Sequence, residues 1–210
     1  FNKPILLQEQ NSFPGITNKI LAKYAKKIFV AYENMDKFFP ENKILNFGNP
    51  IRNRLFNIKS KDIEAFKKDN DIKNNKTILF LGGSLGAKVM NDYVFNNENY
   101  FNENNYQVIL QCGERYQQNY LNKSTSLIKV IPFIDDMHLA FSCSDLIVSR
   151  SGAIIISELS NLGKPVIFIP SPNVAEDHQT KNAKYLYEID AAELVHEDEI
   201  DYKLNSIIKK

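Results

Sequence analysis

The sequence predicts an α/β protein built on a doubly wound parallel sheet, with the end of a second α/β unit in front of it. The first observation is a regular alternation of short apolar runs with helical segments from residue 77 onward. The second is that these runs are apolar almost throughout, which is typical of strands buried on both faces of a parallel sheet. The third is a turn-rich stretch from Asn49 to Arg54, where we place the domain boundary.

Size and composition indicate a folded domain and part of another. The 210 residues exceed one average domain but are few for two complete ones. With 43% hydrophobic residues the chain can bury a sizeable core, and no apolar run approaches the roughly 20 residues of a membrane-spanning helix. The chain opens on Phe1 without a signal peptide and closes in a helical pattern at Ile207–Lys210, so we expect both ends to be cuts.

Cys112 and Cys143 lie in apolar stretches without metal-ligand spacing, which is typical of reduced, buried thiols.

The first fifty residues contain short strands and one helix. An apolar run from Pro4 to Leu7 precedes a polar loop, and the turn Pro14-Gly15 leads to a helix for which Thr17 is a suitable N-cap. The apolar face of this helix is expected to consist of Ile20, Leu21, Tyr24 and Ala25. Ile28–Ala31 and Ile44–Phe47 are bounded by polar or turn residues, which is the pattern of short strands.

The second part has the regular rhythm of alternating strands and helices. It begins with a charged stretch, Lys59–Lys76, that has a helical pattern with polar ends. The expected strands are Thr77–Leu81, Tyr106–Gln111, Ile128–Pro132, Asp145–Ser149, Pro165–Pro170 and Ala192–Val195. The expected helices are one from about Ala87, then Asp135–Phe141, Ala153–Leu162 and Gln179–Glu188. Because such sheets bind ligands at the carboxyl ends of their strands, the loops after these strands are the places to search for a site.

The net charge of +1 conceals an uneven distribution. Residues 1–60 carry ten Lys and Arg against four Asp and Glu, so this part has a charge of +6 and the remainder −5. A basic segment permits contact with an anionic membrane surface or a phosphorylated ligand. A solvated helix face explains the same charge at least as well.

The loop after the first strand of the second part is rich in glycine and leads into a helix. It runs Leu81-Gly82-Gly83-Ser84-Leu85-Gly86-Ala87. Glycines let the backbone approach a phosphate closely, and a helix N-terminus offers free N–H groups and a favourable dipole. The spacing fits neither a dinucleotide fingerprint, whose next strand would end in an acid, nor a Walker loop, which needs Gly-Lys-Ser/Thr. A tight turn without a ligand explains such a loop about as often as a phosphate site does.

A second strand-to-helix loop runs from Ser149 to Ala153. Gly152 permits close approach at the helix start, where free amides can hold a diphosphate. Glu158, one to two turns inside the helix, can accept hydrogen bonds from both hydroxyls of a ribose. Taken alone, Glu158 is better interpreted as an ordinary solvated helix acid.

Two further loops follow core strands. The long polar loop Ser171–Asn182 offers amide and carboxylate groups suited to sugar hydroxyls, although a flexible loop capped by Asp177 is the simpler interpretation.

In the loop Pro132–Met137, Asp135 or Asp136 can cap a helix, while an exposed backbone edge at Ile134 can pair with a base such as uracil. The adjacent aspartates invite a metal, but no third ligand is evident. Four such loops at one edge of a sheet are stronger evidence than any one alone.

Together these segments resemble the MurG family of glycosyltransferases, which transfer N-acetylglucosamine from UDP-GlcNAc to lipid I, giving lipid II in peptidoglycan synthesis. The matching stretches are Glu9-Gln10-Asn11, Pro14-Gly15, Thr17-Asn18, Gly48-Asn49-Pro50-Ile51-Arg52, Gly82–Ala87, Phe133–Met137, Ser149–Ala153, Ser157-Glu158-Leu159, Gly163-Lys164-Pro165, Asp177–Thr180 and Asn182-Ala183. They occur in the family's order across nearly the whole chain, so the resemblance is specific.

The resemblance implies a GT-B fold, in which two Rossmann-like domains face a cleft. Residues 1–50 then form the incomplete end of the acceptor-side domain, and 51–210 form the UDP-sugar domain without its last helices. The implied reaction is inverting and uses no metal or other cofactor. Its partners are UDP-GlcNAc, lipid I and an anionic membrane surface, with no nucleic acid. The implied location is peripheral, on the cytoplasmic face of the bacterial cell membrane, with roles in cell-wall biogenesis, cell shape and cell division.

The resemblance also implies roles for residues. Ile134 pairs with uracil through its backbone, Glu158 holds the ribose, and Gln179 recognises sugar hydroxyls. The expected substrate-binding set is Asn11, Arg52, Ser84, Ile134, Ala153, Ile154, Ile155, Ile156, Ser157, Glu158 and Gln179, with Gly83, Gly152 and His178 as secondary members.

This chain departs from the family pattern in places. Gln8 stands where the family usually has His, and Leu85 stands where many members have Gln. The family's N-terminal Gly-rich loop and histidine do not occur, so we name no general base and expect the chain alone to be inactive. Two alternatives stay open: another GT-B enzyme using a UDP-sugar, such as a glycolipid glycosyltransferase or a UDP-GlcNAc 2-epimerase, and a non-catalytic nucleotide-sugar-binding module.

Overall fold

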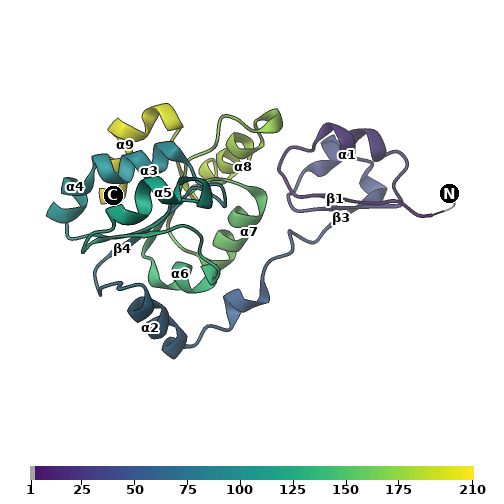
Figure 1. Ribbon diagram of the computed structural model, residues 1–210. Coiled ribbons are helices and arrows are strands. Elements are labelled where there is room, and N and C mark those ends of the chain that lie inside the picture. Colours follow the sequence, from purple (N-terminus) through teal and green to yellow (C-terminus); the bar gives the residue numbers. More distant parts are fainter. Residues whose placement is uncertain (1–2) are drawn as a thin grey trace.

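Two parallel sheets organise the chain in the computed structural model, which describes residues 3–210 (Figure 1). The opening at Phe1 therefore lies outside the described residues. The first sheet has the order β1-β2-β3 and the second the order β6-β5-β4-β7-β8-β9. All neighbouring strands are parallel, and the order of the second sheet reverses between β4 and β7. This is a doubly wound sheet with its switch point beside β4.

The first sheet is covered on one face. Its elements are β1 (Leu6–Glu9), α1 (Ile16–Leu21), β2 (Lys27–Val30), the short 3-10 helices η1 (Met35–Lys37) and η2 (Glu41–Lys43), and β3 (Ile44–Asn46). Ile28 and Val30 point into a small core with Ala22 and Ala25. Phe47, just after β3, remains 75% exposed.

Helix α1 differs from the prediction at its start and on its face. Its N-cap is Gly15, not Thr17, and no side chain caps it. The free N–H groups are instead satisfied from farther away, since Glu9 binds Gly15 N–H and Glu176 binds Ile16 N–H. The predicted apolar face is wrong for Ile20 and Tyr24, which are exposed, and right for Leu21 and Ala25, which pack in the small core.

The connection between the sheets contains η3 (Asn53–Phe56) and α2 (Ser60–Asp69). The predicted helix to Lys76 is wrong, because α2 ends in a Schellman motif. Asp71 has a left-handed φ of 50°, and the Ile72 N–H bonds to the Lys67 carbonyl at 2.8 Å. This turn directs Ile72 into the core. The proposed division into domains at residue 50 stays a prediction.

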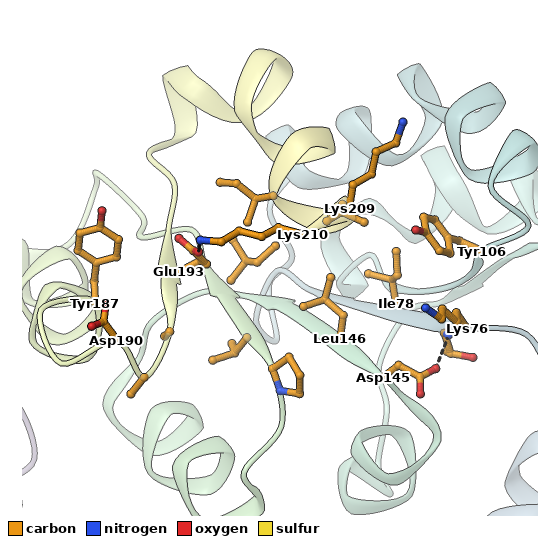
Figure 2. A pocket seen from close by; sticks show the side chains of 18 residues that line it. Lys76, Ile78, Tyr106, Asp145, Leu146, Tyr187, Asp190, Glu193, Lys209 and Lys210 are labelled. Atoms are coloured by element: carbon orange, nitrogen blue, oxygen red, sulfur yellow. Dashed lines mark hydrogen bonds and ion pairs between the residues drawn. The ribbon is translucent and has the colours of Figure 1, made fainter.

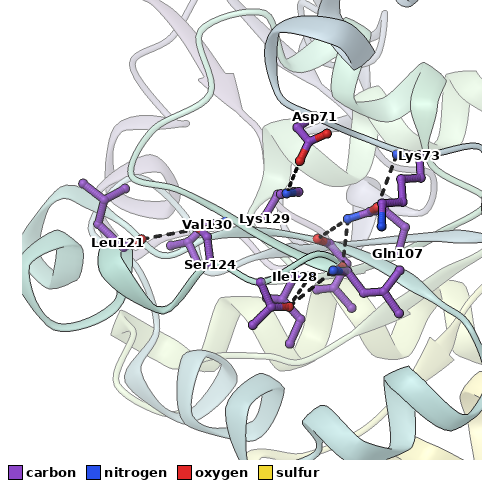
Figure 3. A network of polar contacts seen from close by, with 11 residues as sticks. Asp71, Lys73, Gln107, Leu121, Ser124, Ile128, Lys129 and Val130 are labelled. Atoms are coloured by element: carbon purple, nitrogen blue, oxygen red, sulfur yellow. Dashed lines mark hydrogen bonds and ion pairs between the residues drawn. The ribbon is translucent and has the colours of Figure 1, made fainter.

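The segment after α2 is fastened to the sheet by a polar network (Figure 3). Buried Gln107, the first residue of β5, accepts a hydrogen bond from Lys73 N–H at 3.3 Å and donates to the Leu127 carbonyl at 2.8 Å. Lys129 pairs with Asp71 beside it. The connection thus lies against the amino ends of β5 and β6.

The second sheet carries helices on both faces. Its strands are β4 (Thr77–Leu81), β5 (Gln107–Gln111), β6 (Ile128–Ile131), β7 (Leu146–Ser149), β8 (Val166–Phe168) and β9 (Glu193–Leu194). Its helices are α3 (Lys88–Asn96), α4 (Glu98–Glu103), α5 (Gln117–Tyr120), α6 (Met137–Cys143), α7 (Ala153–Leu162), α8 (His178–Tyr187) and α9 (Ile200–Lys209). Short 3-10 helices are η4 (Glu114–Tyr116), η5 (Leu121–Lys123), η6 (Ala175–Asp177) and η7 (Glu197–Glu199).

Strand β4 shows how the two faces are built. Ile78 and Phe80 pack into one core with α3, α4 and α9, whereas Leu79 and Leu81 pack into another with α6, α7 and α8.

Helix α6 starts two residues later than predicted, and Asp136 at its N-cap makes no side-chain capping bond. Within residues 3–210, no helix has both the length and the apolar character needed to cross a membrane.

Candidate nucleotide-sugar site

A cavity of about 960 Å³ lies at the carboxyl ends of β4, β5 and β7, beside the switch point of the second sheet. This is the edge at which a doubly wound sheet binds its ligands. The residues of the predicted set that line it are Arg52, Gly83, Ser84, Ile134, Gly152, Ala153, Ile154, Ile155 and Gln179. The structure therefore brings together predicted residues that are up to 127 positions apart in the chain, as are Arg52 and Gln179.

The Gly-rich loop after β4 is held in place by backbone packing. A Cβ on Gly86 would lie 2.0 Å from the Cys112 carbonyl oxygen, and one on Gly113 would lie 2.2 Å from the Gly86 nitrogen. Both residues also have a positive φ, of 79° and 85°. Gly83 has a φ of 85° but open space around its missing Cβ. The loop is thus rigid on its inner side and open at Gly83.

Gln111, which stands where a dinucleotide fingerprint would have an acid, connects two loops of the cavity. It is 2% exposed and is the last residue of β5. Its Nε2 donates to the Gly83 carbonyl at 3.1 Å, and its Oε1 accepts from the Ile134 N–H at 3.1 Å. The predicted exposed backbone edge at Ile134 is therefore wrong for its N–H group, which is already paired.

Glu158 is buried, so its interpretation as a solvated helix acid is wrong. The residue is 2% exposed, and burial raises the pKa of its carboxyl while the nearby Arg52 opposes that shift more weakly. Arg52 Nε lies 3.4 Å from Glu158 Oε1. Nevertheless, Oε1 accepts no hydrogen bond from the described residues. A buried carboxylate oxygen without a donor is costly, and a ligand hydroxyl is one way to satisfy it.

The other α7 residues of the predicted set have different surroundings. A helix presents only one side to a cavity, so the consecutive residues Ala153–Glu158 do not all line it. Ile156 is 3% exposed and packs in the core. The Ser157 hydroxyl donates to the Ala153 carbonyl and accepts from Asn49 Nδ2 at 3.0 Å. Neither Ile156, Ser157 nor Glu158 lines the cavity itself.

Gln179 is held at the cavity by the loop that precedes α8. Its Oε1 accepts from Ser171 N–H at 2.9 Å, and its carbonyl accepts from the Ser151 hydroxyl at 2.9 Å. His178 does not line the cavity, and its Nδ1 is buried without a hydrogen-bond partner among residues 3–210. The side-chain nitrogen of Gln179 remains as the group that can reach a ligand.

Asn11 contacts α8 and not the cavity. Its Oδ1 accepts from Asn182 Nδ2 at 3.0 Å, and the backbone N–H and hydroxyl of Ser12 both donate to Asn182 Oδ1. Buried Glu9 holds this loop by accepting from Asn11 N–H at 3.0 Å. In Figure 1 the first sheet accordingly lies beside α8. The family resemblance included Asn182 only as part of a matching stretch. No local sequence pattern predicts that its side chain contacts residues 170 positions away.

The neighbouring aspartates form no metal site. Among residues 3–210, no group of three or more His, Cys, Asp or Glu side chains is arranged to hold a metal ion. Asp136 instead lies 3.8 Å from Arg54, and both side chains are exposed.

A second cavity, of about 810 Å³, lies at the opposite edge of the sheet (Figure 2). Its wall contains Ile78 and Leu146 near the starts of β4 and β7. Three of its charged groups are engaged within the fold, since Asp145 accepts from Thr77 N–H at 2.7 Å and Lys210 pairs with Glu193 at 2.8 Å. The strand-end loops do not reach this edge, so the first cavity is the candidate site.

Comparison with known proteins identifies the family. Residues 77–210 match the model of the glycosyltransferase family 28 C-terminal domain. The chain belongs to this family. Curated relatives named UDP-N-acetylglucosamine--N-acetylmuramyl-(pentapeptide) pyrophosphoryl-undecaprenol N-acetylglucosamine transferase are similar over nearly all of the chain. The protein from Flavobacterium psychrophilum is 47% identical over 208 residues, covering 97% of this chain and 56% of the relative. The protein from Christiangramia forsetii is 44% identical over 197 residues, covering 94% and 54%.

Solved structures give the same assignment for the fold of this family 28 chain. Acinetobacter baumannii MurG superimposes with a TM-score of 0.74 at 29% identity, covering all of this chain and 59% of MurG. A glycosyltransferase from Rickettsia africae, at 13% identity and a TM-score of 0.62, shows the same fold alone. The predicted GT-B type α/β fold is confirmed. The chain spans about half the length of the curated relatives it matches.

Proposed function

We propose that this family 28 chain is the UDP-sugar-binding part of an inverting enzyme that transfers N-acetylglucosamine from UDP-GlcNAc to lipid I, giving lipid II in peptidoglycan synthesis. One observation carries the proposal. A single cavity has the Gly-rich loop and the N-terminus of the ten-residue helix α7 on its wall, with the buried Glu158 carboxylate close behind it. The printed names of the curated relatives support the donor and the acceptor.

The diphosphate of the donor fits between the Gly-rich loop and the start of α7. Gly83 and Gly152 leave room for close approach of the diphosphate. The free N–H groups at the N-terminus of α7 favour a negatively charged ligand there. During transfer the acceptor hydroxyl attacks the anomeric carbon, and the bond from that carbon to the UDP oxygen breaks. Negative charge then grows on the diphosphate. The helix amides and the Arg52 guanidinium, which also lines the cavity, stabilise that charge.

The nucleoside and the sugar use the remaining groups. Glu158 accepts hydrogen bonds from the ribose hydroxyls once the Arg52 side chain, 59% exposed, turns toward the diphosphate. The Ile134 backbone pairs with uracil, and Gln179 recognises the sugar. The loop at Asn11 and Ser12 belongs to the acceptor-side unit and is docked on α8.

The proposed lipid acceptor places the protein peripherally at the cytoplasmic face of the bacterial cell membrane. The charge of +6 over residues 1–60 and the exposed side chains of Ile16, Ile20 and Tyr24 support contact with an anionic surface. Vesicle sedimentation with and without anionic lipid tests this point. Binding that does not depend on anionic lipid contradicts it.

Calorimetric titration with UDP-GlcNAc tests the donor site, with UDP-galactose and NAD as controls. Selective binding of UDP-GlcNAc is the expected result, and a preference for NAD contradicts the assignment of the Gly-rich loop. The alternatives are separated by products: label transferred to lipid I identifies the proposed enzyme, and free epimerised sugar identifies a 2-epimerase. Selective binding without either product, in an enzyme extended to the length of its relatives, identifies a non-catalytic module.

A further inference from the structure

Gln111 occupies a place where one side chain controls two loops. It ends β5, which lies between β4 and β6 in the second sheet. The loop after β4 carries Gly83, and the loop after β6 carries Ile134. Both loops line the 960 Å³ cavity, and so does Gln111.

The two halves of the Gln111 carboxamide are both used. The NH₂ group donates to the Gly83 carbonyl and the oxygen accepts from the Ile134 N–H, each at 3.1 Å. The side chain is only 2% exposed, so water competes little for these bonds. The distance between the two loops is thereby fixed by a single planar group.

We propose that Gln111 is a positioning residue that sets the base selectivity of the nucleotide site. This inference rests on the proposed function, since it takes the cavity as the site of a uridine nucleotide. With the Ile134 N–H paired to Gln111, the backbone group that remains at Ile134 is its carbonyl, which accepts no hydrogen bond within residues 3–210. A carbonyl is matched by the N3–H of uracil, whereas cytosine presents an unprotonated N3 at the same place.

The chemistry of the carboxamide suggests two different substitutions. Gln111→Leu removes both hydrogen bonds and frees both loops. Gln111→Glu keeps an acceptor for the Ile134 N–H but has no donor for the Gly83 carbonyl. The first variant therefore tests both loops together, and the second disturbs only the Gly-rich loop.

Gln107 provides a matched control at the other end of the same strand. It is also a buried glutamine, and it also joins two segments, through Lys73 and Leu127. It lies at the amino end of β5, away from the cavity. Gln107→Leu is expected to lower stability without changing the choice of base.

The experiment measures the Kd of UDP and of CDP by calorimetry for the wild-type chain and the three variants, together with thermal unfolding of each. The wild type is expected to prefer UDP by about tenfold or more. Gln111→Leu is expected to weaken UDP binding about tenfold and to bring the two nucleotides close to equal affinity. Gln111→Glu is expected to weaken both nucleotides while keeping the preference.

Several outcomes overturn the inference. One is a folded Gln111→Leu variant with the wild-type ratio, and another is tighter UDP binding by that variant, because the carboxamide would then compete with the base for the Ile134 N–H. If Gln111→Leu does not fold, a Gln111→Glu variant with wild-type UDP affinity or with a lost preference overturns it. A wild-type chain that binds neither nucleotide contradicts the proposed function as well, whereas a selective wild type with unchanged variants contradicts this inference alone.

Discussion

Arg52 Nε lies 3.4 Å from Glu158 Oε1, yet the two side chains differ greatly in exposure, at 59% for the arginine and 3% for the glutamate. The carboxylate has lost its water, and the arginine has kept most of its own. Such a pair stabilises the fold little, because the desolvation of the acid offsets much of the attraction. The arrangement is better suited to a ligand that replaces the missing hydrogen bonds of the acid.

The first prediction concerns ribose binding by Glu158. Glu158→Ala is expected to weaken UDP binding by about 1–3 kcal/mol, because the ribose hydroxyls lose their acceptor. Calorimetric titration with UDP measures the change. Glu64→Ala, an acid on α2 that is 71% exposed, serves as the control and is expected to bind UDP normally. Unchanged affinity in a folded Glu158→Ala variant removes the ribose role.

The second prediction concerns pH. Burial raises the pKa of Glu158 above its ordinary value of 4.5. The folded state then binds more protons than the unfolded state between those two pKa values, so the contribution of Glu158 to stability falls as pH rises through that interval. In Glu158→Gln this contribution is absent. Urea denaturation of both proteins at several pH values measures it, and a difference in unfolding free energy that stays constant with pH contradicts the prediction.

The third prediction concerns the backbone contact under the Gly-rich loop. Gly113→Ala is expected to cost about 2 kcal/mol or more, since Gly113 has a φ of 85° and its Cβ would lie 2.2 Å from Gly86 N. It also displaces the loop and so lowers UDP affinity. Gly15→Ala, whose Cβ would meet nothing within 4 Å, is expected to cost less than about 1 kcal/mol. Equal melting temperatures for the two variants contradict this account.

The fourth prediction concerns the junction between the first sheet and α8. Asn182→Ala leaves the Ser12 N–H and the Asn11 Oδ1 without their partners, and is expected to cost about 1–3 kcal/mol. Residues near Asn11 should then become more sensitive to proteolysis, because the loop loses its anchor. Asn161→Ala removes an exposed bond within α7 and is the control. The same proteolysis pattern in both variants shows that Asn182 does not anchor the loop.

The architecture was accessible from the sequence because it rests on local patterns. Apolar runs such as Thr77–Leu81 and Gln107–Gln111 have to be buried on both faces, and helices between them enforce parallel pairing. The end of α2 was missed for a local reason. The sequence pattern continued past Asp69, but Asp71 adopts a left-handed conformation so that Ile72 can enter the core.

The sequence by itself determined the fold class, the family, and the loops that surround the cavity. Only the tertiary structure decided which groups in those loops are free. It buried Glu158 behind Arg52 and paired the Ile134 N–H with Gln111. It also joined Asn182 to Asn11 and Ser12 across about 170 residues. The physical reason is that apolar periodicity fixes which strands form, whereas the hydrogen-bond partner of a polar side chain depends on which strand ends become neighbours in the folded sheet.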